Sequence, residues 1–342
     1  MRVENFDLLR PDEVAAFDRP SPARWLLAVA KEWLVIGAAI AAALWFPLWW
    51  VWLVAALVVA TRQNALGILT HEGTHCHVAG SVYWNDLLAN WLTAYPMFIS
   101  SEGFRTVHMR HHNHLEMTDD PSRIGFDLHP EDWTFPTSRG RLAWILLRDI
   151  SALGQAKSSV TLLRYVWNAK GRAKGGRVAG GFVKHLIRIV ALHGTALTAA
   201  IVTGHLAAYV LLWVAPLFTV ALALYRMRGT AEHCGIVTNE LRYTRTTNEP
   251  LLTTRTIVPH ALMRLLVVPH HVTYHLEHHL YSGVPFFRLR RLHERLMTEP
   301  RFRTEAHITR GHRALIRELT SPIAPQPFDP AHANLEAEVT HG

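Results

Sequence analysis

The sequence predicts an all-α integral membrane protein with four transmembrane helices in two hairpins and a cytoplasmic helical cap. Three observations lead to this fold class: two long apolar blocks, three clusters of histidine at helical spacing, and basic residues concentrated in one loop. The composition agrees with it. A chain with 49% hydrophobic residues, 12 Trp and only 18% charged residues is too apolar for an ordinary soluble enzyme.

The first hairpin follows a polar N-terminal segment. Residues 1–24 carry charges of both signs and no apolar run, so they do not resemble a cleavable signal peptide, and we expect them to be cytoplasmic. Residues 33–60 then contain no acidic or basic residue, and Pro47 interrupts them among several tryptophans. Because a span needs about 20 residues at 1.5 Å rise each, we expect helices over about 25–46 and 48–69 with a turn at a Trp-rich interface.

A second apolar block predicts the other hairpin. It divides at Gly204, which gives expected spans over about 186–204 and 206–226. The segment Trp84–Ser100 is also apolar, but it is short and contains Pro96. We therefore expect it to be interfacial or re-entrant rather than a fifth span.

The distribution of charge predicts the orientation in the membrane. Residues 133–188 contain 11 Lys or Arg and one acid, which places this loop in the cytoplasm by the positive-inside rule. With four spans, the histidine clusters and the C-terminal third then lie on the cytoplasmic side. The net charge of +8 indicates attraction to anionic lipid or to an acidic redox partner, and no motif indicates nucleic-acid binding. Residues 25–300 form the predicted membrane domain, and 301–342 a partly disordered tail.

The histidines are grouped in a way that suits metal binding. The clusters are His71 and His75; His108, His111 and His112; and His275, His278 and His279. Residues at i, i+3 and i+4 share one face of a helix, so each cluster can aim its imidazoles at one point. Imidazole suits Fe, Zn, Cu and Ni, and this many rings exceed the needs of one tetrahedral zinc. Two metal ions are the natural count. Polar histidines on solvated helix faces would explain any one cluster alone.

Several neighbours of these clusters are candidates for supporting roles. Three acids stand next to candidate ligands, where a carboxylate would hold an imidazole N–H in the right tautomer: Glu72, Glu232 and Glu277. His271 precedes His275 by four residues and would lie on the same helical face, so it is a candidate ligand or neighbour of the ligands. His233 follows the last predicted span by a few residues.

The chain resembles the membrane fatty acid desaturase superfamily over roughly residues 25–300. The resemblance rests on four segments: HEGTHCH (71–77), HMRHHNHLEMTDDPS (108–122), RGTAEH (228–233) and YHLEHHLYSGVPFFRLRRLH (274–293). It implies a centre of two irons with nine histidine ligands: His71, His75, His108, His111, His112, His233, His275, His278 and His279. It also implies O₂ as co-substrate and abstraction of hydrogen from an unactivated C–H bond.

The resemblance leaves the reaction and the substrate open. Removal of two hydrogens from an alkyl or acyl chain gives a double bond, whereas a hydroxylase or ketolase of the same superfamily adds oxygen. The substrate is expected to be a lipid or a small amphipathic, amino-acid-type metabolite. The sequence contains no fused cytochrome b5 domain, so electrons are expected from a separate ferredoxin, rubredoxin or cytochrome b5 type donor.

Two other classes of protein remain as alternatives. Residues 71–75, HEGTH, match the H-E-x-x-H pattern of zinc metalloproteases and would suit an intramembrane protease with Glu72 as general base. That interpretation uses two histidines and leaves the others unexplained. A membrane haem protein with paired histidine ligands would not explain why H-x-x-H-H occurs twice.

Overall fold

The computed structural model describes residues 8–151, 177–237, 242 and 247–322. Within these ranges the chain is mainly helical, and two short strands are the exception to the all-α expectation. The disorder predicted for the end of the chain, after residue 322, lies outside the described residues.

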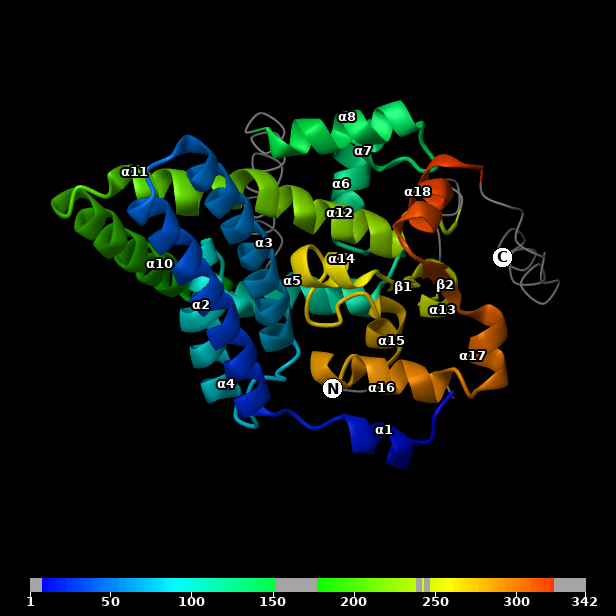
Figure 1. Ribbon diagram of the computed structural model, residues 1–342. Coiled ribbons are helices and arrows are strands. Elements are labelled where there is room, and N and C mark those ends of the chain that lie inside the picture. The colour runs from blue at the N-terminus through cyan, green and yellow to red at the C-terminus, as the bar shows by residue number, and fades with distance from the viewer. Residues whose placement is uncertain (1–7, 152–176, 238–241, 243–246, 323–342) are drawn as a thin grey trace.

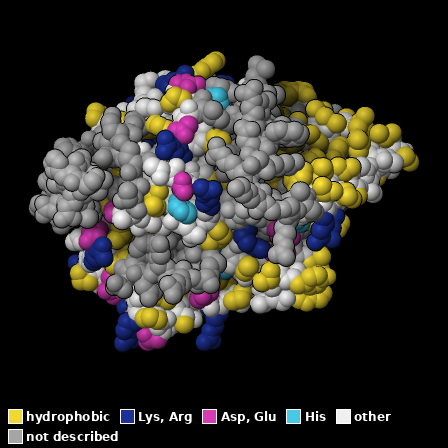
Figure 2. Space-filling model, turned by 180° about the vertical axis from the view of Figure 1, so that it is seen from behind, with side chains coloured by type: hydrophobic (Ala, Val, Ile, Leu, Met, Phe, Trp, Pro, Cys, Tyr) yellow, Lys and Arg dark blue, Asp and Glu magenta, His cyan; other side chains and the backbone are white. Residues whose placement is uncertain are grey.

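Four helical segments are long and apolar enough to cross a membrane: Pro22–Trp45, Trp49–Thr74, Gly181–Val202 and Leu206–His233. They correspond to α2 (Pro22–Trp45), α3 (Trp49–Thr74), α10 (Arg177–Val202) and a run of α11 (Leu206–Tyr209), η3 (Val210–Val214), η4 (Leu217–Ala221) and α12 (Leu222–His233). α10 begins before the predicted start at 186, and α12 continues beyond the predicted end at 226. Apolar side chains gather on the surface at the end of the molecule that these helices form (Figure 2).

Residues 46–48 connect α2 to α3, and the two helices pack against each other. Their shared core includes Ile36, Val59 and Leu66. A buried ion pair joins them as well, because Nη1 of Arg62 lies 2.9 Å from Oε2 of Glu32. This pair connects two helices that each have the length and composition of a membrane span, where charged residues are rare and usually paired.

Short helical pieces follow α3: α4 (Val82–Ala89), the π-helical η1 (Asn90–Ala94) and the 3₁₀-helical η2 (Tyr95–Met97). None of them has the length of a membrane span. Two tryptophans of the long helices hold them, since Nε1 of Trp33 donates to the carbonyl of Leu92 at 2.8 Å and Nε1 of Trp213 to that of Pro96 at 3.2 Å. The segment is thereby fixed beside the end of α3.

The remaining elements form a cap beside the ends of α3 and α12 (Figure 1). They are α1 (Pro11–Phe17), α5 (Ser101–Asn113), α6 (Arg123–Leu128), α7 (Pro130–Trp133), α8 (Arg139–Ile150), α13 (Pro250–Thr253), β1 (Arg255–Val258), α14 (Ala261–Leu266), α15 (His275–Leu280), α16 (Phe286–Leu296), α17 (Pro300–Glu305), β2 (His307–Arg310) and α18 (His312–Thr320). The N-terminal segment belongs to this cap, because Leu8 and Leu9 pack into the core formed by α15 and α16.

Residues 301–320 belong to the predicted, partly disordered tail, and in the structure they are folded. β2 pairs in parallel with β1, with His307 opposite Arg255. α18 then buries Leu315 and Leu319 in a cluster with Ile257 of β1. The pairing joins segments about fifty residues apart, and a four-residue strand gives little signal of such a partner in the sequence.

Candidate metal centre

The end of α3 provides two buried imidazoles. His71 lies in the last turn of the helix, and His75 is the residue that caps its C-terminus. Gly73 between them allows neighbouring elements to come close. A Cβ atom there would lie 2.6 Å from Cβ of Ala89 and 2.9 Å from Oγ of Ser101. A larger residue at position 73 would therefore push α4 and α5 away from this turn.

Three further helices provide the other predicted ligands. α5 begins after Ser100, whose Oγ accepts the N–H of Gly103 at 3.2 Å as an N-cap. The histidines come from their helices in this order: His108, His111 and His112 from α5, His233 from the last residue of α12, and His275, His278 and His279 from α15. The helical spacing that the sequence indicated is therefore present in the structure.

Five of these imidazoles form one group, which we call the five-histidine group: His71, His75, His108, His112 and His278. Their candidate ligand nitrogens all lie within 4.8 Å of one another. Nε2 of His108 is 3.0 Å from Nε2 of His75 and 2.9 Å from Nε2 of His112. Nε2 of His278 is 3.0 Å from that of His112.

The remaining four, which we call the four-histidine group, are His111, His233, His275 and His279. Two overlapping sets of candidate ligand atoms contain them and share His233: one is His111, His233 and His279, and the other is Glu232, His233 and His275. Nε2 of His275 lies 2.9 Å from Nε2 of His233 and 3.1 Å from Nε2 of His279. The groups are adjacent, because the rings of His112 and His279 stack with centroids 4.1 Å apart. All nine histidines predicted as ligands are thus brought together.

The closest nitrogens within the groups are near enough to one another to share a metal ion. With a metal–imidazole bond of about 2.1 Å, two ligands of one ion have nitrogens about 3.0 to 3.4 Å apart. The shortest contacts, 2.9 to 3.1 Å, lie near the lower end of this range. Imidazole ligands suit Fe, Zn, Cu and Ni, and the two groups could hold one ion each.

Most of the imidazoles are also held in the neutral form that binds metal. His111 is the exception, because burial would lower its pKa but the neighbouring Asp120 raises it overall. Burial is the largest cause that lowers the pKa of His75, His108 and His112 well below its usual value, and repulsion between neighbouring imidazoles lowers it further. The same holds for His278 and His279 on α15. A cluster of unprotonated rings with facing lone pairs is costly to assemble unless a cation binds among them.

Glu72 contacts His77, which is not a predicted ligand, and makes no hydrogen bond to the adjacent ligand candidate His71. Its Oε2 accepts the backbone N–H of Phe286 at 3.0 Å and lies 3.0 Å from Nδ1 of His77. Its other oxygen, Oε1, is 3.9 Å from Nδ1 of His71, beyond hydrogen-bond distance. The His77 ring is stacked beside that of His75. Glu72 therefore ties α3 to the start of α16 and orients His77.

The two other predicted acids differ in position. Glu277 is fully buried, and its hydrogen-bond partners are not predicted ligands. Its Oε2 accepts from the hydroxyl of Thr256 at 2.5 Å, and its Oε1 lies 2.5 Å from Nδ1 of His293. Glu232 lies within the cluster, because Oε2 is 3.6 Å from Nε2 of His275. Of the two, Glu232 is the carboxylate that could itself contact a bound ion.

Asp120 is a carboxylate of the site that the sequence analysis missed. Its Oδ1 and Oδ2 lie 3.0 and 3.1 Å from Nδ1 of His111. It accepts the backbone N–H groups of Glu116 and Ser122, both at 2.8 Å. The local signal was the acidic pair that follows the second cluster. The sequence does not show that the eight residues between His111 and Asp120 turn back and bring the two side chains together.

His271 does not share a helical face with His275, so that expectation is wrong. α15 begins at His275, and both His270 and His271 adopt left-handed backbone angles, with φ of 56° and 55°. Pro269 precedes this turn and cannot donate the backbone hydrogen bond that a longer helix would need. His271 is absent from the groups of ligand atoms found among the described residues.

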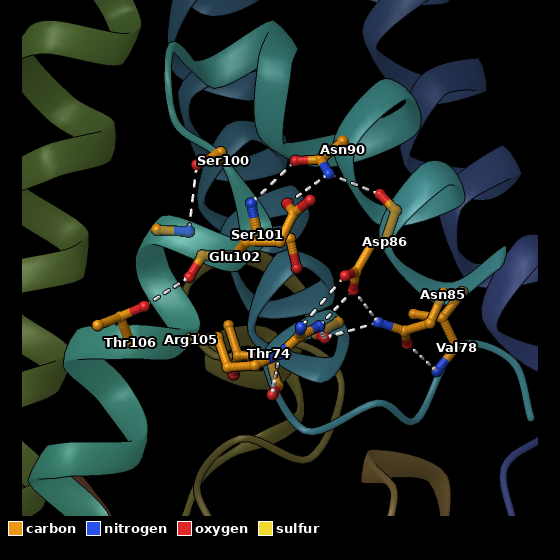
Figure 3. A network of polar contacts seen from close by, with 12 residues as sticks. Thr74, Val78, Asn85, Asp86, Asn90, Ser100, Ser101, Glu102, Arg105 and Thr106 are labelled. Carbon is orange, nitrogen blue, oxygen red and sulfur yellow. Dashed lines mark hydrogen bonds and ion pairs between the residues drawn. The ribbon is translucent and has the colours of Figure 1, made fainter. Parts of the chain in front are cut away.

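A network around Arg105 connects the first two clusters (Figure 3). Its guanidinium donates to the carbonyls of Thr74 at 2.9 Å and Gly73 at 2.8 Å, and it forms an ion pair with Asp86. Arg105 lies one turn before His108 on α5. The network therefore connects the end of α3, the middle of α4 and the first half of α5.

Comparison with known proteins was consistent with this centre. The sequence profile of the fatty acid desaturase family ("Fatty acid desaturase") matches residues 47–310. A dihydrorhizobitoxine desaturase of Bradyrhizobium elkanii is 25% identical over 290 residues, which cover 82% of this chain and 78% of that relative. The matched region contains both histidine groups.

Proposed function

This chain belongs to the fatty acid desaturase family, and on that premise we propose that it is a membrane-bound, O₂-dependent di-iron enzyme that introduces a double bond into an alkyl or acyl chain. The substrate would be a lipid or an amphipathic metabolite. The family supports a desaturase-type oxidoreductase. The metal, the membrane topology and the substrate are the parts that we propose.

One observation carries the proposal: nine buried or half-buried imidazoles from four helices meet in two adjacent groups with nitrogen spacings near 3.0 Å. The five-histidine group would hold one iron, and the four-histidine group, with Glu232 beside it, the other. Iron bound there would supply the activation of O₂ and the abstraction of hydrogen from an unactivated carbon. An all-nitrogen ligand set leaves positions for O₂ open.

The overall reaction balances with an external donor. The substrate loses two hydrogen atoms from adjacent carbons, the donor supplies two electrons with two protons from solvent, and O₂ leaves as two molecules of water. The protein's part is to orient the ligands and exclude water. Asp120 orients His111 by its contact with Nδ1, and Trp25 and Val29 of α2 pack in one apolar cluster with Leu69, two residues before His71.

We further propose that the centre faces the cytoplasm and accepts electrons from a ferredoxin, rubredoxin or cytochrome b5 type protein. The excess of Lys and Arg over residues 133–188 supports this orientation. Reporter tags at the N-terminus, after Gly175 (outside the described residues) and at the C-terminus should report the cytoplasm, and a tag near Pro47 the opposite side. An opposite result at Gly175 would contradict the orientation.

The mass of the products tests the reaction. When the chain is expressed with a competent reductase, lipids and metabolites that lose two hydrogens indicate desaturation, and a gain of one oxygen indicates the hydroxylase alternative. A small amino-acid-type substrate has its own support, because the relative from Bradyrhizobium elkanii is named for action on dihydrorhizobitoxine. Extracts should therefore be analysed for polar metabolites as well as lipids.

A further inference from the structure

A cavity of about 430 Å³ lies beside the metal centre and outside the ligand groups. Its walls come from α2, α14, the turn before α15 and the start of α16: Lys31, Ala261, Arg264, Leu265, Pro269, His270, His271 and Phe286. None of these eight lining residues is acidic. The volume is within the range of sites for small molecules.

The charges around the cavity favour an anion. Glu32 is buried behind it and is shared by three groups, with contacts of 3.0 Å to Lys31, 2.9 Å to Arg62 and 3.1 Å to His270. Arg264 is exposed and forms no ion pair with any residue that the structure describes. Counting Lys31, Arg62 and Arg264 against Glu32 and Glu72, which accepts the backbone N–H of Phe286, leaves a net charge of +1 among these side chains.

His271 experiences this positive field directly. Burial is the largest cause that lowers its pKa, and the positive charges of Arg264 and Arg290 lower it further. Its backbone and that of His270 are both left-handed, a conformation that residues other than glycine adopt at a cost and that is often found at functional sites. The turn brings two consecutive imidazoles to the wall of the cavity.

The position of the cavity suits an amphipathic molecule. α14 exposes Leu262 and Leu265, with 65% and 57% of their surfaces accessible, beside the cation of Arg264. α14 packs against α3, where Arg62 donates to the carbonyl of Leu265. Exposed leucines next to a basic side chain are typical of a helix at a membrane interface. A lipid-like molecule could enter here without leaving the membrane surface.

One wall of the cavity also contacts the metal centre. The ring of Phe286 lies against that of His270, with centroids 5.3 Å apart, and its backbone N–H donates to Glu72 at 3.0 Å. Glu72 follows His71, a member of the five-histidine group, in the sequence. Phe286 thereby links the cavity to the end of α3 that carries a candidate ligand.

We propose that this cavity binds the anionic group, a carboxylate or a phosphate, of the amphipathic molecule that the centre oxidises. The proposal rests on the proposed function for the identity of the bound molecule. Lys31 and Arg264 provide the charge, and His271 provides a further hydrogen-bond donor. The anionic end would fix the distance along the chain at which oxidation takes place.

Direct binding measurements test this site without turnover. Iron-loaded full-length protein in phosphatidylcholine nanodiscs is titrated under anaerobic conditions with decanoate, with lysophosphatidic acid and with decanol as the uncharged control. Arg264→Gln should weaken binding of at least one anionic probe about tenfold, and Lys31→Gln should weaken it in the same direction. Decanol binding should not change. Arg303→Gln, an exposed arginine on α17, is the matched control and should leave all affinities unchanged.

The outcomes separate the sources of the anion. A loss for decanoate alone supports a carboxylate group, and a loss for lysophosphatidic acid alone supports a phosphate group. Unchanged affinity for both anions in both variants would overturn the site, as would an equal loss for decanol. A chain that holds no iron would contradict the proposed function but would leave the titration interpretable, because none of the substituted residues is a candidate ligand.

Discussion

The carboxylate of Asp120 meets Nδ1 of His111 at 3.0 Å, on the opposite side of the ring from the candidate ligand nitrogen. A carboxylate accepts and does not donate, so in the neutral ring Nδ1 carries the proton and Nε2 has a lone pair for a metal. Burial alone would raise the pKa of Asp120, but its contacts with His111 and Ser122 lower it overall. Burial alone would lower the pKa of His111, but Asp120 raises it overall, so a metal that binds Nε2 displaces a proton when the ring is charged. Asp120 therefore stays ionised and fixes the tautomer of its partner.

Replacing this carboxylate should weaken the four-histidine group. Asp120→Asn removes the charge and offers His111 a less basic acceptor, so we expect iron affinity or activity to fall about 10- to 100-fold. Iron retained after dialysis against a graded chelator measures the affinity. Asp119→Asn is the matched control, because that neighbouring acid is exposed and pairs with Arg110 at 3.5 Å. Equal loss in the two variants would contradict a specific role for Asp120.

The metal-free protein should lose stability as the pH falls. The pKa values of six imidazoles outside the spans are lowered well below 6.5, chiefly by burial: His75, His108, His112, His275, His278 and His279. As the pH falls, these histidines therefore become protonated in the unfolded chain at a higher pH than in the folded protein. Stability is complete above about pH 6.5 and declines as the pH drops towards the folded-state values. The Tm of apo-protein in detergent should fall between about pH 7.5 and 5.5, and a constant or rising Tm would contradict this.

The sequence predicted the ligand clusters better than their surroundings. His108, His111 and His112 could be grouped because helical spacing is local, and the structure keeps them on one helix. Asp120 and the β1–β2 pair could not be found in this way, because each depends on a contact across a turn or a long stretch of chain. The expectation for His271 was wrong for a related reason. It stands four residues before His275, as on one helical face, but the left-handed backbone angles of His270 and His271 lie outside any helix.

Arg105 should stabilise the fold as well as the site. Arg105→Ala would leave Asp86 without its ion pair and remove donors to the carbonyls of Gly73 and Thr74, so we expect a loss of about 2 to 3 kcal/mol. Thermal unfolding of the detergent-solubilised protein measures it. The control is Arg301→Ala, whose exposed pair with Glu305 should contribute less than about 0.5 kcal/mol. Similar Tm values for the two variants would contradict this role.

Glu72 distinguishes the desaturase interpretation from the zinc protease alternative. In a protease Glu72 would activate the water on zinc, so Glu72→Gln would abolish activity outright. In this structure its Oε2 is occupied by Phe286 and His77, so we expect a partial loss of iron affinity or activity of about 10- to 100-fold. His77→Gln should show a loss in the same direction. Proteolysis that is present in the wild type and absent from Glu72→Gln would contradict the desaturase interpretation.

The iron content of purified protein tests the central claim most directly. After anaerobic reconstitution, the wild type should bind close to two irons per chain, and His233→Ala should lose at least one because it removes an imidazole from the four-histidine group. His205→Ala is the control. This residue is exposed in the turn before α11, and its loss should leave both irons bound. One zinc and no iron in the wild type, or two irons and full activity in His233→Ala, would contradict the di-iron centre.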